Sequence, residues 1–219
     1  MSECPEIDAI IFDFDGVLVE SVSIKGDALV KLYEAEGADI QAAVLRYHEM
    51  HGGVSRYDKI RYYEETLCGR VCSEERIAEL AQKFSDIVEQ LVVAAPWVEG
   101  AKEFLDKYSL TIPFYVASAT PDAELKRIVE ARGMSGYFKG VYGAPKKKYE
   151  HIADIMVQHN YDSNRLVMIG DAIADFEAAQ KTATHFVGRK LPDRASPFPE
   201  GTVLIDDLTT LDQKIRLAV

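Results

Sequence analysis

The sequence lacks the features that mark secreted, membrane-spanning and nucleic-acid-binding proteins. Its 219 residues include only three cysteines, Cys4, Cys68 and Cys72. Because their number is odd and they are scattered along the chain, they exclude a disulfide framework and favour a protein of the reducing cytoplasm. No apolar run approaches the roughly 18 residues of a membrane span, and the opening MSECPEIDAI has no basic stretch before an apolar one. Lys and Arg total 25 against 36 Asp and Glu, so the net charge of −11 disfavours nucleic acid and anionic membranes as partners.

What remains is the composition of an ordinary folded protein. With 47% hydrophobic and 28% charged residues, the chain can form a sizeable core, and its length suits one or two domains. The surplus of carboxylates matters for function, because an anionic substrate has to overcome their field locally. A metal ion or a few well-placed cations can do this.

Short apolar runs rich in β-branched residues predict buried strands. The three clearest runs cover residues 7–12, 112–117 and 165–169, and weaker ones cover 140–142, 184–187 and 203–205. Helical patterns alternate with these runs from about residue 98, which is typical of βαβ units and a parallel sheet. The expected helices are 149–159, 175–181 and one that begins with Thr120 as its N-cap and Pro121 in its first turn.

Residues 19–95 break this alternation, because they show amphipathic helical patterns and no convincing strand. The clearest helix starts at Ser73 and places a set of apolar residues on one face: Ile77, Leu80, Ala81, Phe84, Val88 and Leu91. A helical stretch of this length is too long for one crossover connection. We therefore expect a helical domain at 19–95, inserted into an α/β domain formed by 1–18 and 96–219.

Two carboxylates follow the first predicted strand. Asp13 and Asp15 stand at i and i+2, on one side of an extended backbone, and Gly16 lets the chain turn sharply after them. Anions so close repel each other unless a cation or a shared proton compensates, and a hard divalent ion with oxygen ligands is the natural remedy. A purely structural alternative is a strand-end cap followed by a turn. Because open α/β sheets bind ligands at the carboxyl ends of their strands, we treat this segment as a candidate site.

The third predicted strand is followed by a second acidic pair, Asp171 and Asp175. If a helix begins near Ala174, Asp171 lies in the loop above the sheet and Asp175 in the first helical turn. The helix dipole favours a negative charge there, so Asp175 has an adequate structural explanation of its own. Asp171 has a weaker one.

Ser118 ends the second run, and the backbone N–H groups of a predicted helix N-terminus follow it from Ala119 onward. This arrangement can cradle a phosphate, although capping is the commoner role of Ser or Thr at such a position. Three lysines, Lys146 to Lys148, precede another predicted helix. They are either a solvated basic patch or a source of one lysine that turns inward.

In chain order, the loops after these strands offer Asp-x-Asp-Gly, Ser, Lys and Gly-Asp-x-x-x-Asp. With these motifs the sequence resembles, over nearly its whole length, the haloacid dehalogenase (HAD) superfamily. The match is to its phosphatase branch, which includes phosphoglycolate phosphatases and β-phosphoglucomutases, and the helical insert is similar to that branch's type 1 cap. The resemblance implies a doubly wound, mainly parallel, Rossmann-like α/β core with an inserted helical cap domain.

The resemblance also implies roles for the acidic residues. Asp13 would be the nucleophile that becomes an aspartyl phosphate, and Asp15 the general acid and base. Magnesium would lie between the Asp13 carboxylate, the Asp15 backbone carbonyl and Asp171. Asp175 would be a further ligand or a group that orients the others.

The phosphate-binding residues implied by the resemblance are Gly16, Ser118, Ala119 and one lysine. The run Lys148-Tyr149-Glu150-His151-Ile152 resembles the family's Lys-x-Glu-x-Ile/Leu pattern, which favours Lys148, with Lys146 as the alternative. Dehalogenases of the superfamily lack an acid at the position of Asp15, and its phosphate-pumping ATPases have Thr there, so Asp15 indicates a phosphate ester as substrate.

Specificity is expected from the cap, in which Gly52 and Gly53 can bring backbone close to a ligand. His51 and Arg56 could pair with a second anionic group, although an ordinary helix–helix loop explains them equally well. The function expected is that of a magnesium-dependent phosphatase for a small phosphorylated metabolite, in a cytoplasmic monomer or homodimer. The alternatives are a phosphomutase and a binding protein with an inert HAD fold.

Overall fold

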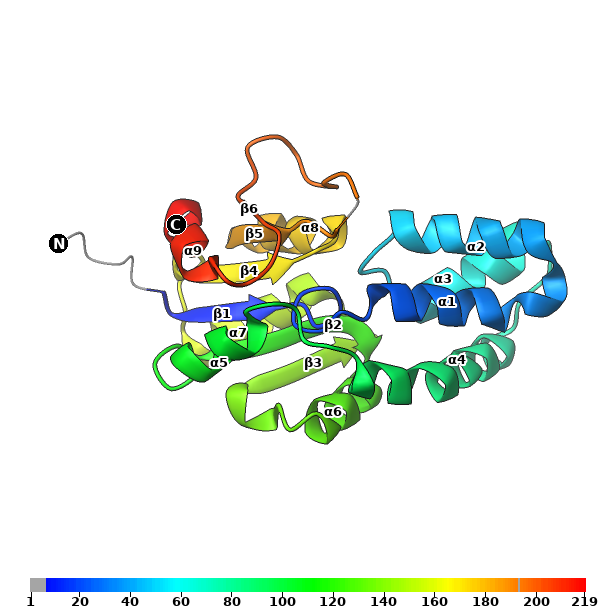
Figure 1. Ribbon diagram of the computed structural model, residues 1–219, viewed down its shortest axis with the longest axis horizontal. Coiled ribbons are helices and arrows are strands. Elements are labelled where there is room, and N and C mark those ends of the chain that lie inside the picture. Colours follow the sequence, from blue (N-terminus) through cyan, green and yellow to red (C-terminus); the bar gives the residue numbers. More distant parts are fainter. Residues whose placement is uncertain (1–6, 193) are drawn as a thin grey trace.

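A computed structural model describes residues 7–192 and 194–219 (Figure 1). The sheet has six parallel strands in the order β3-β2-β1-β4-β5-β6. Their bounds are β1 Ala9–Phe12, β2 Phe114–Pro121, β3 Gly140–Ala144, β4 Leu166–Gly170, β5 His185–Arg189 and β6 Leu204–Ile205. All six predicted strands are therefore present, with ends that differ by up to four residues from the predicted ones.

Helices occupy most of the remaining chain. The α-helices are α1 Val22–Leu32, α2 Ala38–Met50, α3 Arg56–Tyr62, α4 Glu74–Ala94, α5 Ala101–Tyr108, α6 Asp122–Ala131, α7 Lys148–His159, α8 Ile173–Thr182 and α9 Leu211–Ala218. Short helical turns lie at η1 Glu34–Glu36, η2 Tyr63–Leu67, η3 Ser135–Tyr137 and η4 Ser163–Arg165.

The strands are buried on both faces, which explains their continuous apolar runs. In β1, Ile10 and Phe12 belong to the core cluster shared with α5, α6 and α9, whereas Ala9 and Ile11 belong to the cluster shared with α7 and α8. Successive residues thus pack against opposite helical layers, as the two-residue period of a strand requires. This confirms the predicted α/β fold with a doubly wound parallel sheet.

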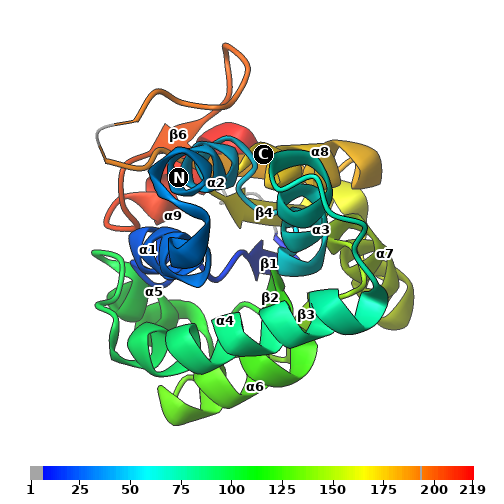
Figure 2. The ribbon, with the colours of Figure 1, turned by 90° about the vertical axis from the view of Figure 1, so that its right-hand side faces the viewer.

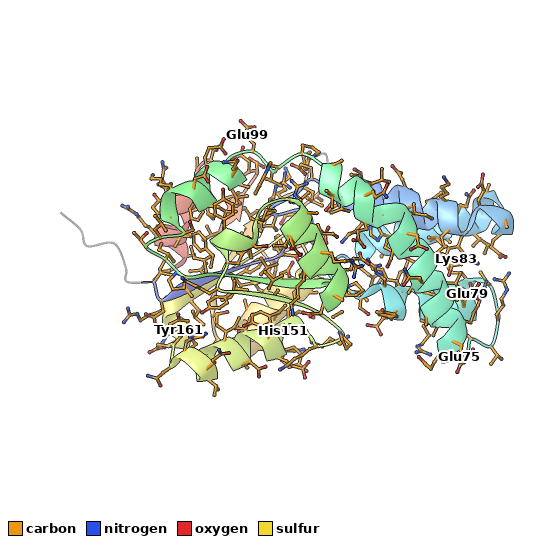
Figure 3. The ribbon with its side chains drawn as sticks, turned by 90° about the horizontal axis from the view of Figure 1, so that it is seen from below. Glu75, Glu79, Lys83, Glu99, His151 and Tyr161 are labelled. Atoms are coloured by element: carbon orange, nitrogen blue, oxygen red, sulfur yellow. The ribbon has the colours of Figure 1, made fainter. Side chains whose placement is uncertain are left out.

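Helices α1 to α4, called the cap helices below, lie between β1 and the rest of the sheet in sequence. Seen from their side, they lie in front of the carboxyl ends of β1, β2 and β4 (Figure 2). Glu75, Glu79 and Lys83 are exposed on the outer side of α4 (Figure 3), while its inner side packs into the core. The inserted helices match the expected cap, and the domain boundaries at residues 18 and 95 stay a prediction.

Two local predictions need correction. The segment Thr120–Pro121 is the end of β2 rather than the start of a helix, because Pro121 pairs with Ala144 and α6 begins only at Asp122. In α4, Leu91 is 49% exposed and Val92 occupies the buried face in its place.

Cys68 and Cys72 are free thiols, while Cys4 lies outside the described residues. In the described part of the chain, none of the helices has the length and apolarity needed to cross a membrane.

Candidate active site

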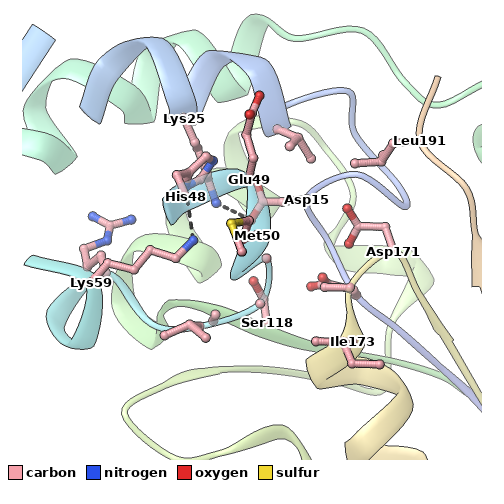
Figure 4. A pocket seen from close by; sticks show the side chains of 18 of the residues that line it. Asp15, Lys25, His48, Glu49, Met50, Lys59, Ser118, Asp171, Ile173 and Leu191 are labelled. Carbon is pink, nitrogen blue, oxygen red and sulfur yellow. Dashed lines mark hydrogen bonds and ion pairs between the residues drawn. The ribbon is translucent and has the colours of Figure 1, made fainter. Parts of the chain in front are cut away.

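The candidate active site lies where β1 and β4 end side by side under the cap helices. Because these two strands pair in parallel, the loops after them bring Asp13 and Asp171 to the same edge of the sheet. A cavity of about 130 Å³ opens there, and both residues line it. Its other walls come from the cap helices and the loop that follows α2, from residues 118–120 at the end of β2, from the start of α8, and from Leu191, Arg194 and Pro197 after β5 (Figure 4).

Three carboxylates form the centre of the site. Oxygen atoms of Asp13, Asp171 and Asp175 all lie within 4.8 Å of one another. The Lys148 ammonium contacts two of them, at 2.9 Å from Asp13 Oδ2 and in a short hydrogen bond to Asp175. Two buried carboxylates and a half-buried one face a single ammonium. Carboxylate oxygens are hard donors, so the cluster fits the requirements of a divalent cation such as Mg²⁺.

Burial and mutual repulsion dominate the electrostatics of this cluster. Burial raises the pKa of Asp13 to about 7, against the opposing effect of Lys148. Burial also raises the pKa of Asp171 well above its usual range, and the charge of Asp13 adds to the effect. The pKa of Lys148 is raised as well, because its carboxylate neighbours outweigh its burial. A bound cation would favour the ionised form of all three acids.

Asp175 is held in place on both sides of its carboxylate. It is fully buried in the first turn of α8, where Oδ1 accepts from Lys148 and Oδ2 accepts from the Ala172 backbone N–H at 3.1 Å. Helix α8 begins at Ile173, close to the predicted position. The arrangement suits a residue that orients the lysine and the loop around Asp171.

Asp15 lies apart from the three-carboxylate cluster and has its own partners. Its carboxylate accepts hydrogen bonds from Ser21 at 2.5 Å, from Thr120 at 3.0 Å and from Lys25 in a short ion pair. Burial alone raises the pKa of Asp15, but the Lys25 ammonium and these hydrogen bonds outweigh it and hold the pKa below its usual value.

The turn after Asp15 requires glycine. Gly16 has φ of 75°, and a Cβ atom there would lie 2.4 Å from an Asp171 oxygen. Any larger residue would therefore push the β1 and β4 loops apart.

The expected phosphate cradle differs from the prediction in its backbone. Ser118 and Ala119 line the cavity, but they belong to the extended end of β2 rather than to a helix N-terminus. The buried Ser118 hydroxyl accepts from the Thr120 backbone N–H at 3.1 Å. Any phosphate contact at this position comes from a strand end.

The three lysines have separate partners. Lys148 turns inward to Asp13 and Asp175, whereas Lys146 forms an ion pair with the exposed Asp154. Lys147 reaches Asp58 of α3 at 3.1 Å. Of the two lysines left open by the sequence, only Lys148 therefore lies at the acidic cluster.

Arg56 is the candidate that needs correction. It lines the cavity, but its guanidinium forms two hydrogen bonds to Glu124 of α6, at 2.5 and 2.6 Å. A third hydrogen bond reaches Ser85 at 2.5 Å, so Arg56 joins the cap helices to the sheet domain instead of facing an anionic ligand. His51 is stacked on Tyr47 and bonded to the carbonyl oxygen of that residue.

Sequence reasoning missed three residues that the cap helices bring to the cavity: Lys25 of α1, His48 of α2 and Lys59 of α3. For Lys59, the spacing in the sequence could have indicated its position. Lys59 follows Arg56 by three residues on a helix capped by Ser55, so the two side chains share a helical face.

Arg189 links the end of β5 to the turn after β1. Its buried guanidinium donates to the Gly16 carbonyl at 2.8 Å and to both carboxylate oxygens of Glu20, at 2.6 and 3.1 Å.

We expect Arg189→Met to lower the free energy of unfolding by about 2 kcal/mol, because it leaves these acceptors unpaired. Urea denaturation measures the loss. Lys190→Met, at the exposed next position, is the control, and equal stability of both variants would contradict the expectation.

Comparison with known proteins gives a family match and a curated relative. The sequence profile of the haloacid dehalogenase-like hydrolase family matches residues 10–189. A phosphoglycolate phosphatase from Photobacterium profundum is 27% identical over 207 residues, which cover 86% of this chain and 85% of that protein.

Solved structures share the fold. A β-phosphoglucomutase from Clostridium difficile has a TM-score of 0.76 at 22% identity, with 94% of this chain and 93% of that one covered. The HAD-hydrolase YfnB from Bacillus subtilis, determined bound to magnesium, has a TM-score of 0.72 at 17% identity, with 95% and 98% covered. Both structures include the cap helices in the match, since the covered share is nearly the whole chain.

Proposed function

The chain belongs to the family of haloacid dehalogenase-like hydrolases, and we propose that it is a magnesium-dependent phosphatase acting on a small phosphomonoester. The observation that carries the proposal is the meeting of Asp13, Asp171, Asp175 and Lys148 at one edge of the sheet. The distant phosphoglycolate phosphatase relative supports the same reaction class.

In the first step, an Asp13 carboxylate oxygen attacks phosphorus, and the bond from phosphorus to the ester oxygen breaks. The Phe14 backbone N–H donates to Asp13 Oδ1 at 2.7 Å and orients the carboxylate for attack. Asp15 in its protonated form gives its proton to the leaving oxygen, so the products are an alcohol and an acyl phosphate on Asp13.

In the second step, Asp15 takes a proton from water and the oxygen of that water attacks phosphorus. The acyl phosphate bond breaks, which releases inorganic phosphate and restores the Asp13 carboxylate. Lys148 and Ser118 hold the nonreacting phosphoryl oxygens through both steps.

Asp13, Asp171 and the Asp15 backbone carbonyl would hold Mg²⁺, and Asp175 would orient them through Lys148 and the Ala172 N–H. When bound, the ion supplies positive charge against the phosphoryl oxygens.

The proposal is tested by measuring phosphate release from a panel of small phosphomonoesters with Mg²⁺, with product isomers analysed in parallel. Release of free phosphate supports a phosphatase. Isomerisation without release would identify the alternative, a phosphomutase, which the similarity to the β-phosphoglucomutase fold makes worth testing. Absence of any turnover would leave a binding protein with this fold.

Metal removal should abolish the activity. With a chelator, we expect phosphate release to fall to about a hundredth or less and to return when Mg²⁺ is added in excess. Asp171→Asn should raise the Mg²⁺ concentration for half-maximal activity about tenfold or more, because it removes one charged ligand. Full activity in the chelated protein would refute the role of the metal.

A further inference from the structure

The Lys and Arg residues that line the cavity differ in whether a carboxylate pairs with them. Most of them have a carboxylate partner within the described residues: Lys25 pairs with Asp15, Arg56 with Glu124 and Arg194 with Glu49. Lys59 is the exception. Across residues 7–192 and 194–219, no carboxylate lies within 4.0 Å of its Nζ atom.

Lys59 is nevertheless almost completely buried. Its side chain is 5% exposed and extends into the cavity, where Nζ lies 3.0 Å from Nδ1 of His48 (Figure 4). Burial lowers the pKa of His48 to about 3, so the ring is neutral near pH 7. A neutral imidazole has one unprotonated ring nitrogen, so Nδ1 can accept from the Lys59 ammonium.

A neutral imidazole orients the ammonium but does not balance its charge. A buried cation without a counter-charge is unfavourable, and burial together with the repulsion of Lys25 lowers the pKa of Lys59 to about 7. The carboxylates of Asp15 and Asp171 act on Lys59 only from a distance. Within the described residues His48 is the one hydrogen-bond partner of Lys59 Nζ, so the protonated amine can donate to a ligand in the cavity that it lines.

We propose that Lys59, oriented by His48, is a specificity-determining residue that binds a second anionic group of the substrate. This inference rests on the proposed phosphatase function. The substrate class is then a small phosphomonoester that also carries a carboxylate or a second phosphate.

Arg56, which the sequence suggested for this task, is satisfied by Glu124. Lys59 lies one helical turn further along the same face of α3 and has no carboxylate partner in the part of the chain that the structure describes. The subsite is therefore formed by the packing of two cap helices, because His48 of α2 lies beside Lys59 of α3.

The test measures binding without turnover, in the Asp13→Asn background with Mg²⁺ present. The dissociation constants of 2-phosphoglycolate and 2-hydroxyethyl phosphate are compared, since these esters differ in one carboxylate. We expect the carboxylate to tighten binding about 10- to 100-fold and Lys59→Met to remove that preference. Binding of 2-hydroxyethyl phosphate should change by less than about threefold. The exposed Lys83→Met is the charge-matched control.

The second arm compares the dissociation constants of glucose 1,6-bisphosphate and glucose 6-phosphate. It tests whether a phosphate can serve as the second anionic group. A preference in either arm that depends on Lys59 supports the subsite. Equal binding within both pairs, or equal weakening of both members of each pair in Lys59→Met, would overturn it.

Turnover by the unsubstituted protein separates this inference from the proposed function. If no ester is hydrolysed, the phosphatase proposal falls while the binding comparison still decides the role of Lys59.

Lys59→Met should also raise the Tm of the ligand-free protein by about 2–4 °C, because it removes an unbalanced buried charge. A residue retained only for packing would lower it.

Discussion

Asp13→Asn is expected to reduce phosphate release by about three orders of magnitude or more while the protein stays folded. An amide oxygen is a poor nucleophile, so the acyl phosphate cannot form. Asn has nearly the volume of Asp and can still accept the Phe14 N–H bond at this buried position. Lys148 keeps its second partner, Asp175, so the loss of one charge does not leave the ammonium unpaired.

Steady-state phosphate release and circular dichroism together measure this effect. Asp27→Asn is the matched control, because Asp27 is exposed on α1 and the substitution makes the same change in charge. If Asp13→Asn retained more than about a tenth of the activity, Asp13 could not be the nucleophile.

The sheet and the acidic cluster were predictable because both depend on local sequence. Each apolar run marks a strand, and parallel strands end at the same edge of a sheet. The residues just after two such runs, Asp13 and Asp171, were therefore expected to meet, and their carboxylate oxygens lie within 4.8 Å of each other.

The cap contacts were not predictable, because they depend on how helices pack. The pairing of Arg56 with Glu124 spans 68 positions, and nothing near either residue indicates it. The same holds for His48 and Lys59, which come from different helices. The end of β2 was misplaced for a similar reason, since Pro121 becomes part of a strand only through its partner Ala144.

Glu124→Ala is expected to lower the free energy of unfolding by about 3–5 kcal/mol, because it leaves the Arg56 guanidinium buried without a counter-charge. The two side chains are 6% and 3% exposed and form two hydrogen bonds of 2.5–2.6 Å. Glu130→Ala, at an exposed position of the same helix, is the control and should cost less than about 1 kcal/mol.

The double variant Arg56→Met with Glu124→Leu separates the ion pair from the packing around it. Apolar residues of similar size remove both buried charges together, so most of the lost stability should return. Urea denaturation of the single and double variants then gives a coupling energy, expected to be about 3 kcal/mol. Single losses below about 1 kcal/mol that simply add would show that Arg56 is not tied to Glu124 in solution. The guanidinium would then be available to an anionic ligand, as the sequence alone had suggested.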